Sequence, residues 1–294
     1  MCKGIIVKTK RCTTWVEAKQ ILFDIASSHK EIFFRGHEDA SWTLTSSLGR
    51  LIRVVGREHN WTEEKKETTR EKMEEEIWCA FKNAYHRIPG GTPGAPPIKE
   101  NFDNESLAFA QHYSLPTSLL DWSRSPYIAA FFAFAGNKRS VLLPAQEVAV
   151  FAFDWEIYEL VLYYSSKEIV DPERIVPNKP ADLSKFLYSV EQDNPPRIKK
   201  IEIKGNPNRR IVYQEGLFTR AYKIKDNIEA YLEEKESFAP ETVLTKVIIP
   251  GTEQGESLRD LALMTINPVT LLSDAEGAAA AAFNSVFRFR LDWM

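Results

Sequence analysis

Cysteine is scarce in this sequence, and its scarcity argues against two classes of small stabilised protein. The 294 residues contain only three cysteines, Cys2, Cys12 and Cys79, which are odd in number and far apart. A disulfide framework needs an even set of cysteines, and a four-cysteine zinc site needs four of them at regular spacing. The sequence therefore predicts a protein of a reducing compartment.

Charge of one sign and long hydrophobic runs are lacking as well. The chain has 38 Lys and Arg against 41 Asp and Glu, a net charge of −3, so no overall field steers nucleic acid or an anionic membrane toward it. The net charge does not exclude a basic groove on one part of the surface. The most apolar stretch, residues 127–135, is far shorter than the roughly 20 residues of a membrane-spanning helix, and residues 1–10 lack a signal-peptide cleavage site. We expect a cytoplasmic protein without membrane contact.

The motifs of several common enzyme classes are also missing. There is no Gly-rich dinucleotide fingerprint, no phosphate loop ending in Gly-Lys, no His-Glu-x-x-His helix and no nucleophile elbow. His37, Glu38 and Asp39 are adjacent, but no further histidine stands at the spacing of a metal ligand. We expect no bound metal.

Apolar residues are plentiful, and their spacing predicts both helices and strands. Hydrophobic residues make up 44% of the chain and aromatics 12%, enough to offset the conformational entropy lost on folding. Strands are expected at residues 31–35, 147–153, 201–203, 211–218 and 242–249, and helices at 15–25, 61–85, 107–113, 126–135, 224–234, 258–264 and 276–287. Because the two kinds of element do not alternate regularly, we predict an α+β fold with a mixed sheet core and packed helices.

Two segments of this pattern stand out. Residues 128–134 are apolar on all sides, behind Ser125 as the cap and Pro126 at the first helical position, so this helix is expected to be buried on every face. Residues 171–196 contain five prolines, so we interpret them as a loop-rich excursion.

Polar residues interrupt the apolar elements in three places, and the first is Arg35. It continues an apolar strand directly and precedes Gly36. An arginine there is costly to bury unless an anion pairs with it, and its planar fork suits phosphate or carboxylate. A salt bridge to an internal acid such as Asp121 explains the residue equally well.

The second place precedes a helix, and the third precedes a glycine. Gln111-His112-Tyr113 and residues 120–125 form a polar, aromatic stretch before the buried helix, which points its amide donors at whatever lies in front of it. Capping is the leading explanation of Asp121 and Ser125 taken alone. At the third place, Gln214 and Glu215 interrupt a β-rich run. A β-bulge there would re-aim the Glu215 side chain, and an exposed edge strand is the alternative interpretation.

Together these segments resemble the FRG domain family, named for the tripeptide that occurs here as Phe34-Arg35-Gly36. The most specific part of the resemblance is the run Gln111-His112-Tyr113-x-Leu115-Pro116-Thr117-x-Leu119-Leu120-Asp121-Trp122. The resemblance also includes Trp42-x-Leu44-x-x-Ser47-Leu48-x-Arg50, Ser125-Pro126, Ala129, Arg210, Gln214-x-Gly216-x-Phe218-Thr219 and the helix that follows residues 274–277.

The order of these segments implies one FRG-type domain over residues 1–294. Its core is expected at about 14–288, with the loop-rich insertion at about 165–200. The sequence departs from the family pattern at four positions: His37 replaces the usual Gln, Ser114 a Gly, Ser118 an Arg, and Glu215 a second Gln. Because Ser118 stands in place of the arginine, the resemblance gives less support for anion binding at this position.

A second, pattern-level resemblance concerns chemistry. An arginine on an early strand, a serine before an Ala- and Phe-rich helix and a Gln-Glu pair on a late strand occur in an order similar to that of ADP-ribosyltransferases and NAD-consuming toxins. The resemblance implies an ADP-ribosyltransferase-like arrangement and NAD as substrate. Cleavage of the nicotinamide glycosidic bond develops oxocarbenium character, which a nearby carboxylate stabilises.

This resemblance assigns roles to individual residues. Arg35, beside Gly36, would clamp a phosphate, and Asp121 would orient Arg35 or the loop amides. His112 and Tyr113 would shape the pocket for nicotinamide and ribose.

The remaining roles concern the catalytic pair. Ser123 would hold the cofactor or brace Glu215. Glu215 would bond a ribose hydroxyl and stabilise the transition state, with Gln214 assisting or replacing it.

The family resemblance implies a biological setting and leaves an alternative open. The expected protein is a bacterial or phage toxin or defence effector that transfers ADP-ribose to a protein or nucleic-acid acceptor or hydrolyses NAD, with a neutralising or activating partner. The alternative is a non-catalytic module that binds the phosphates of a nucleotide or nucleic acid. A nuclease is less favoured, because no motif assembles a pair of metal-binding carboxylates.

Overall fold

The structure is a computed structural model that describes most of the chain. The described residues are 6–88, 103–135, 147–169, 180–193, 196–203, 209–222, 224, 227–272 and 275–283. Parts of the expected insertion, residues 170–179 and 194–195, lie outside this set, as does the end of the expected core at 284–288.

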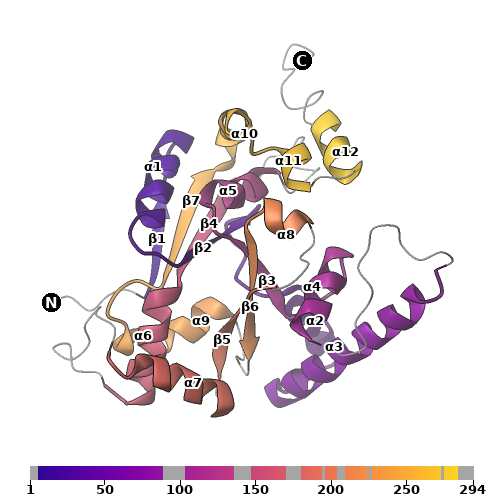
Figure 1. Ribbon diagram of the computed structural model, residues 1–294, viewed down its shortest axis with the longest axis vertical. Helices are drawn as coiled ribbons and strands as arrows, with labels where there is room; N and C mark the ends of the chain where they lie inside the picture. Colours follow the sequence, from indigo (N-terminus) through magenta and orange to yellow (C-terminus); the bar gives the residue numbers. More distant parts are fainter. Residues whose placement is uncertain are drawn as a thin grey trace.

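A seven-stranded mixed sheet forms the centre of the described part of the molecule (Figure 1), which confirms the α+β expectation. The strand order is β1-β7-β4-β2-β3-β6-β5; β1 and β7 pair in parallel, and the other neighbours are antiparallel. The suspected ADP-ribosyltransferase-like arrangement is not confirmed. The strands are β1 Val7–Arg11, β2 Ile32–His37, β3 Leu119–Ser123, β4 Glu147–Asp154, β5 Arg197–Ile201, β6 Gly216–Tyr222 and β7 Leu244–Pro250.

Helix α5 packs on one face of the sheet, between α1 and α10, and its apolar sequence explains the position. Seven of its ten residues are buried and the other three are half-buried, and the Ser125 hydroxyl accepts a hydrogen bond from the Ile128 amide at 3.3 Å. These three helices share one hydrophobic cluster with strands β2, β4 and β7. The helices at this end of the molecule are α1 Trp15–Ala26, α5 Pro126–Ala135, α10 Gln254–Leu263, α11 Pro268–Leu272 and α12 Ala275–Phe283.

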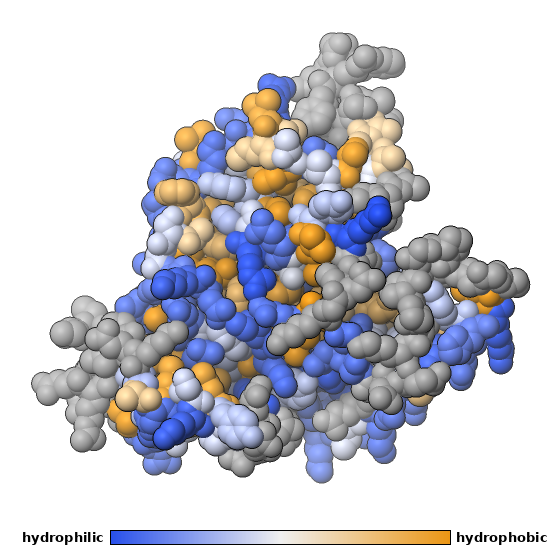
Figure 2. Space-filling model, viewed as in Figure 1, coloured by the Kyte–Doolittle hydropathy of each residue, from blue (hydrophilic) through white to orange (hydrophobic). Residues whose placement is uncertain are grey.

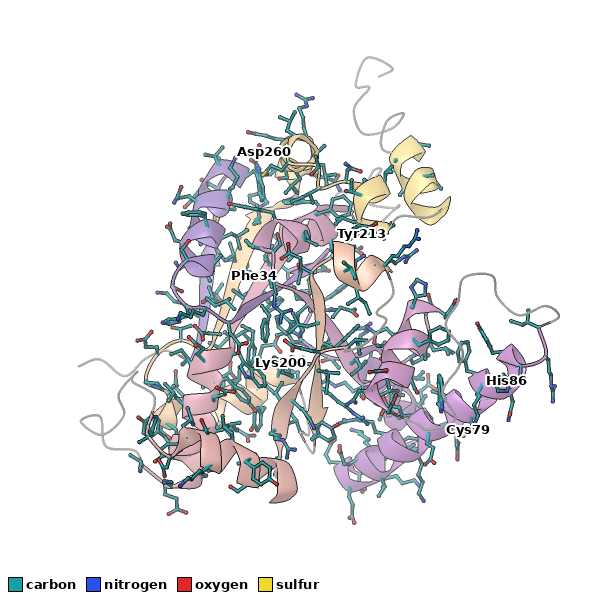
Figure 3. The ribbon with its side chains drawn as sticks, viewed as in Figure 1. Phe34, Cys79, His86, Lys200, Tyr213 and Asp260 are labelled. Atoms are coloured by element: carbon teal, nitrogen blue, oxygen red, sulfur yellow. The ribbon has the colours of Figure 1, made fainter. Side chains whose placement is uncertain are left out.

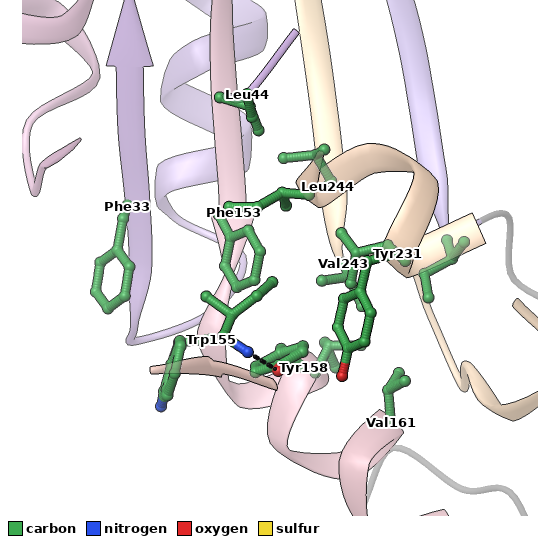
Figure 4. Close-up of a cluster of buried hydrophobic side chains, with 14 of the residues drawn as sticks. Phe33, Leu44, Phe153, Trp155, Tyr158, Val161, Tyr231, Val243 and Leu244 are labelled. Atoms are coloured by element: carbon green, nitrogen blue, oxygen red, sulfur yellow. Dashed lines mark hydrogen bonds between the residues drawn. The ribbon is translucent and has the colours of Figure 1, made fainter. Parts of the chain in front are cut away.

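A second cluster fills the opposite face, where α6 and α9 pack. Figure 4 shows its aromatic centre, in which Phe153 and Trp155 surround Tyr158. The buried Tyr158 hydroxyl accepts a hydrogen bond from the Ile198 amide at 2.7 Å, which ties α6 to β5. The helices here are α6 Trp155–Ser166, α7 Leu183–Asp193 and α9 Ile228–Glu233.

Three further helices lie beside the β3–β6 half of the sheet: α2 Ser47–Glu58, α3 Glu63–Tyr85 and α4 Asn104–His112. Helix α3 confirms the prediction for residues 61–85. The almost fully buried Glu74 carboxylate joins α3 to the sheet, because it accepts from Arg220 of β6 at 2.6 Å and from the Ser118 amide at 2.7 Å.

Some predicted boundaries were wrong. Residues 211–213 belong to a short helix, α8 Arg209–Tyr213, and the strand starts only at Gly216. Helix α7 lies inside the segment interpreted as loop-rich. Strand β2 continues through Gly36 to His37, although the strand was expected to end at Arg35.

Two of the three cysteines lie in the described part of the chain, and they differ in exposure. Cys12 is buried, and burial raises the pKa of its thiol to about 11. Cys79 is exposed on α3 (Figure 3). None of the helices in the described part combines the length and the hydropathy needed to cross a membrane. On the face drawn in Figure 2, hydrophilic and hydrophobic residues are interspersed.

Candidate functional site

The main cavity opens where two neighbouring strands part. Strands β2 and β3 share only one residue pair, Phe34 with Ser123, although β2 pairs with β4 over six residues and β3 pairs with β6 over five. Beyond this pair lies a cavity of about 730 Å³, within the range of about 300–1,000 Å³ typical of ligand pockets. Its walls come from β2, the loop after β2, α2, β3, α5 and the α8–β6 turn. The lining residues are Phe34, Arg35, Gly36, His37, Glu38, Ser41, Trp42, Thr43, Thr45, Arg50, Arg53, Asp121, Trp122, Ser123, Ala129, Phe132 and Gln214.

Five of the eight residues predicted for the site line this cavity. They are Arg35, Gly36, Asp121, Ser123 and Gln214. The other three, Glu215, His112 and Tyr113, do not line it.

Arg35 bridges the gap between the two strands. Its Nη1 atom donates to the Asp121 carbonyl oxygen at 2.7 Å and lies 3.5 Å from the Asp121 carboxylate. The contact agrees with the role expected for Asp121 and with the salt-bridge explanation of Arg35. Among the described residues, Nη2 of Arg35 has no hydrogen-bond partner, so the same guanidinium can still donate to a ligand.

His37 fixes the other side of the Arg35 guanidinium. The two side chains lie on the same face of β2, and Nε of Arg35 donates to Nε2 of His37 at 3.1 Å. Burial and the positive charge of Arg35 lower the pKa of His37 to about 3, so the ring is neutral at physiological pH. Its other nitrogen, Nδ1, is buried and lacks a hydrogen-bond partner of good geometry in the described structure.

Gly36 is required by packing. A Cβ atom on this residue would lie 2.0 Å from the carbonyl oxygen of Ala129 and 2.6 Å from the amide nitrogen of Ala133. Helix α5 therefore rests directly on the backbone of β2. This contact explains the glycine without a role in ligand binding.

Asp121 is held from two sides. Besides Arg35, its carboxylate accepts from the Gln111 side-chain amide, and Gln111 in turn accepts from the Thr117 hydroxyl. The polar residues at the end of α4 thus reach the cavity through Asp121. Gln111 belongs to the predicted motif but was not predicted as a site residue.

Ser123 braces the turn that carries the Gln-Glu pair. Its hydroxyl donates to the Gln214 carbonyl at 2.7 Å and accepts from the Ser125 amide at 3.0 Å. The expected role of Ser123 was either to brace Glu215 or to contact a cofactor. The observed bond is made to Gln214.

The two members of the Gln-Glu pair lie in different environments. Gln214 lines the cavity, and its side-chain amide donates to the Leu271 carbonyl at 3.1 Å. Glu215 is exposed in the turn between α8 and β6, with a left-handed φ of 47°. The expected bulge and the alternative of an edge strand are both wrong, because this residue lies in a turn and β6 is an inner strand.

His112 and Tyr113 end helix α4 away from the cavity. Tyr113 packs against Phe81 of α3 and Phe109 of α4, with ring centroids 5.9 and 5.1 Å apart. The His112 ring lies edge-on to Tyr113 at 4.9 Å. In the described structure these two rings belong to an aromatic cluster between α3 and α4.

Sequence reasoning missed the cavity residues of α2 and of the loop before it. Arg50 and Arg53 come from α2, which was not predicted, and Trp42 comes from the loop. The spacing of Leu48, Ile52 and Gly56 was an available helical signal.

The loop that carries Trp42 is anchored from behind. Both carboxylate oxygens of Glu229 accept from the Leu44 amide, at 2.9 and 3.0 Å, and Lys246 donates to the Ala40 carbonyl. Burial raises the pKa of Glu229. The indole of Trp42 lies edge-on to His37 at 6.1 Å.

The charges that line the cavity favour an anion. Three guanidinium groups, Arg35, Arg50 and Arg53, face two carboxylates, Glu38 and Asp121, while His37 is neutral. Among the described residues, no three or more His, Cys, Asp or Glu side chains are grouped so that they could hold a metal ion.

Comparison with known proteins identifies one domain. Residues 30–141 match the family model described as the FRG domain. No curated protein and no solved structure matches the chain. The matched segment runs from the start of β2 past the end of α5. The chain therefore contains an FRG domain, and this domain supplies every described lining residue of the cavity except Gln214.

Proposed function

We propose that the cavity between β2 and β3 binds NAD, and that the protein cleaves the bond between nicotinamide and ribose. The ADP-ribose would pass to water or to a protein or nucleic-acid acceptor. The setting would be that of a cytoplasmic bacterial or phage toxin or defence effector, with a neutralising or activating partner.

The observation that carries this proposal is the set of three arginines in one cavity. Arg35, Arg50 and Arg53 come from two separate elements and converge on the same space. A diphosphate carries two negative charges and several acceptor oxygens, which guanidinium groups bind through paired hydrogen bonds. Two aromatic lining residues that are not buried, Trp42 and Phe132, supply surfaces for the adenine and nicotinamide rings.

The reaction needs no oxidant or reductant. The C1′–N bond breaks, and nicotinamide leaves with the bonding electron pair. An oxygen or nitrogen of the acceptor forms a new bond to C1′ and releases its proton to solvent. A carboxylate beside C1′ stabilises the positive charge that develops on the ribose.

The position of Glu215 changes which residue we propose as the carboxylate beside C1′. Glu215 is exposed outside the cavity, whereas Glu38 and Asp121 line it. The geometry thus supports Glu38 or Asp121 as the residue that faces the ribose, with Gln214 as the member of the Gln-Glu pair that lies closest to the ligand.

Nicotinamide release from NAD by the purified protein tests the proposal, with cell protein and nucleic acid added as acceptors. We expect Arg35→Ala to abolish release, and Glu38→Gln or Asp121→Asn to lower it about a hundredfold or more. Glu215→Gln is the matched control and should keep full activity. Circular dichroism of each variant separates loss of activity from loss of fold.

Two outcomes have separate meanings. If Glu215→Gln lost as much activity as the cavity variants, the carboxylate assignment would be wrong while NAD use would stand. If the wild-type protein neither released nicotinamide nor labelled an acceptor, NAD cleavage itself would be refuted.

A non-catalytic binding module is the second candidate, and the exposure of Glu215 favours it. The side chains of Gln214 and Ser123 are also engaged in internal hydrogen bonds, to Leu271 and to the Gln214 backbone. Calorimetry that showed tight nucleotide binding, with the ligand intact after long incubation, would support this second function.

A further inference from the structure

Helix α2 carries a row of arginines that leads out of the cavity. Arg50, Arg53 and Arg57 are spaced three and four residues apart, so they lie on one stripe of the helix. The opposite stripe, with Leu48 and Ile52, is buried in the protein. The first two arginines line the cavity, and Arg57 lies one turn beyond them, exposed to solvent.

The arginines of this row make no ion pair with a described carboxylate. Arg50 donates to the Thr45 carbonyl at 2.7 Å. Burial and the nearby charge of Arg35 lower the pKa of Arg50. Like charges three and four residues apart destabilise a helix, so a bound anion would remove a cost that the free protein carries.

The row is too long for the diphosphate of a single NAD molecule. At about 1.5 Å per residue, Arg57 lies about 10 Å along the helix from Arg50. An anion that contacts all three guanidinium groups must therefore repeat its charge along an extended chain. A nucleic-acid backbone has this property, since it carries one phosphate per nucleotide.

Trp42 adds a feature specific to single strands. The side chain is 49% exposed at the cavity, although it is a large aromatic residue. Its loop is tied down through Leu44 and Ala40, and its ring contacts His37, so the exposed indole is held in a fixed position. A cationic track beside a fixed aromatic ring is the arrangement by which proteins bind single-stranded nucleic acid.

We propose that a single-stranded polynucleotide binds along α2, with its phosphates against Arg50, Arg53 and Arg57 and one base stacked on Trp42. Because the proposed function gives Arg50, Arg53 and Trp42 to NAD, the inference rests on that cavity being the anion site and predicts that the strand and NAD exclude each other.

Fluorescence anisotropy with a labelled oligodeoxythymidine of about 12 nucleotides tests the binding in the absence of NAD. Arg57→Ala should weaken binding about threefold to fivefold and reduce the slope of log K against log salt by about 0.7, as expected for one lost phosphate contact. Trp42→Ala should weaken binding at least about fivefold through lost stacking, with little change in that slope. Arg259→Ala, an exposed arginine of the distant helix α10, should change neither quantity.

The controls distinguish this inference from the proposed function. Arg57 lies outside the cavity, so Arg57→Ala should leave NAD hydrolysis by water unchanged. Oligonucleotide binding without any NAD cleavage would support the polynucleotide site and refute the enzyme.

Three results would overturn the polynucleotide site. One is a salt slope that Arg57→Ala leaves unchanged. The second is equal binding of Trp42→Ala and wild type. The third is tighter binding to polyglutamate or to vesicles of anionic lipid, which the exposed Leu51 and Val54 beside the row could contact.

Discussion

Arg35 and His37 lie two residues apart on one face of β2, and a single hydrogen bond sets the state of both. Because Nε2 of His37 accepts from Arg35, the ring must be neutral, with its proton on Nδ1. The guanidinium then keeps its orientation toward Asp121 and the cavity. A protonated ring would lose this bond and repel Arg35.

Folding stability should therefore depend on the titration of His37. Burial and Arg35 lower its pKa in the folded state from 6.5 to about 3. Between these values the unfolded chain binds a proton that the folded protein excludes, so stability present above pH 6.5 falls as the pH drops. The expected loss from this residue is about 1.4 kcal/mol per pH unit. Urea unfolding at pH 7, 5.5 and 4 measures it.

Substitutions at two histidines isolate this effect. His37→Gln keeps an acceptor near the position of Nε2, so Arg35 stays oriented, but it removes the titrating ring; its stability should fall less steeply with pH than that of the wild type. His86 is exposed at the carboxyl end of α3 (Figure 3), and the His86→Gln variant should keep the wild-type dependence of stability on pH. Identical slopes for His37→Gln and the wild type would contradict the assignment.

At the scale of elements, the contact between α5 and β2 fixes the floor of the cavity. Gly36 lets the helix backbone touch the strand, and Ala129 and Phe132 of the helix line the cavity. The position of α5 thus depends on the absence of one Cβ atom.

Gly36→Ala should destabilise the protein by about 3 kcal/mol or prevent folding, because the new methyl group meets backbone atoms of α5 that cannot move alone. Thermal unfolding and denaturant titration measure the effect. Gly255→Ala in α10 is the matched control: nothing lies within 4 Å of its Cβ, and alanine favours helix, so stability should stay equal or rise slightly. A Gly36→Ala protein as stable as wild type would refute the packing explanation.

The elements that could be predicted from sequence are those whose own residues determine them. The buried helix α5 and the long α3 have strong local signals: an apolar surface with a Ser-Pro start, and opposite-charge pairs three residues apart, seen here as Lys66–Glu63 and Arg70–Glu67. Strand β4 is apolar from Val148 to Phe153 and is buried between β7 and β2.

The elements that could not be predicted depend on tertiary contacts. Residues 211–213 favour a strand by composition, yet they form helix α8, which leads into the left-handed turn at Glu215. Gly36 is a strand breaker by propensity, and only its contact with α5 places it inside β2. For the site, the motif residues Arg35, Asp121 and Ser123 could be found, whereas Arg50, Arg53 and Trp42 depend on how α2 and its loop fold over the sheet.

At the scale of the whole molecule, the cavity exists because the sheet is divided between β2 and β3. Each strand keeps its pairing on the far side, to β4 and to β6, while the Arg35 side chain bridges the two across the gap. The chain as a whole carries a net charge of −3, so an anionic ligand must be attracted by local charge. Three arginines in the cavity and a fourth beyond it on α2 provide that charge.

The most direct test of the cavity is a calorimetric titration with ADP-ribose, which the cavity should bind under either candidate function. We expect one molecule bound per chain, about tenfold or more weaker binding for the Arg50→Ala/Arg53→Ala double variant, and unchanged binding for Arg259→Ala. If the wild type bound no ADP-ribose, or if the double variant bound it as tightly as the wild type, the cavity between β2 and β3 would not be the nucleotide site.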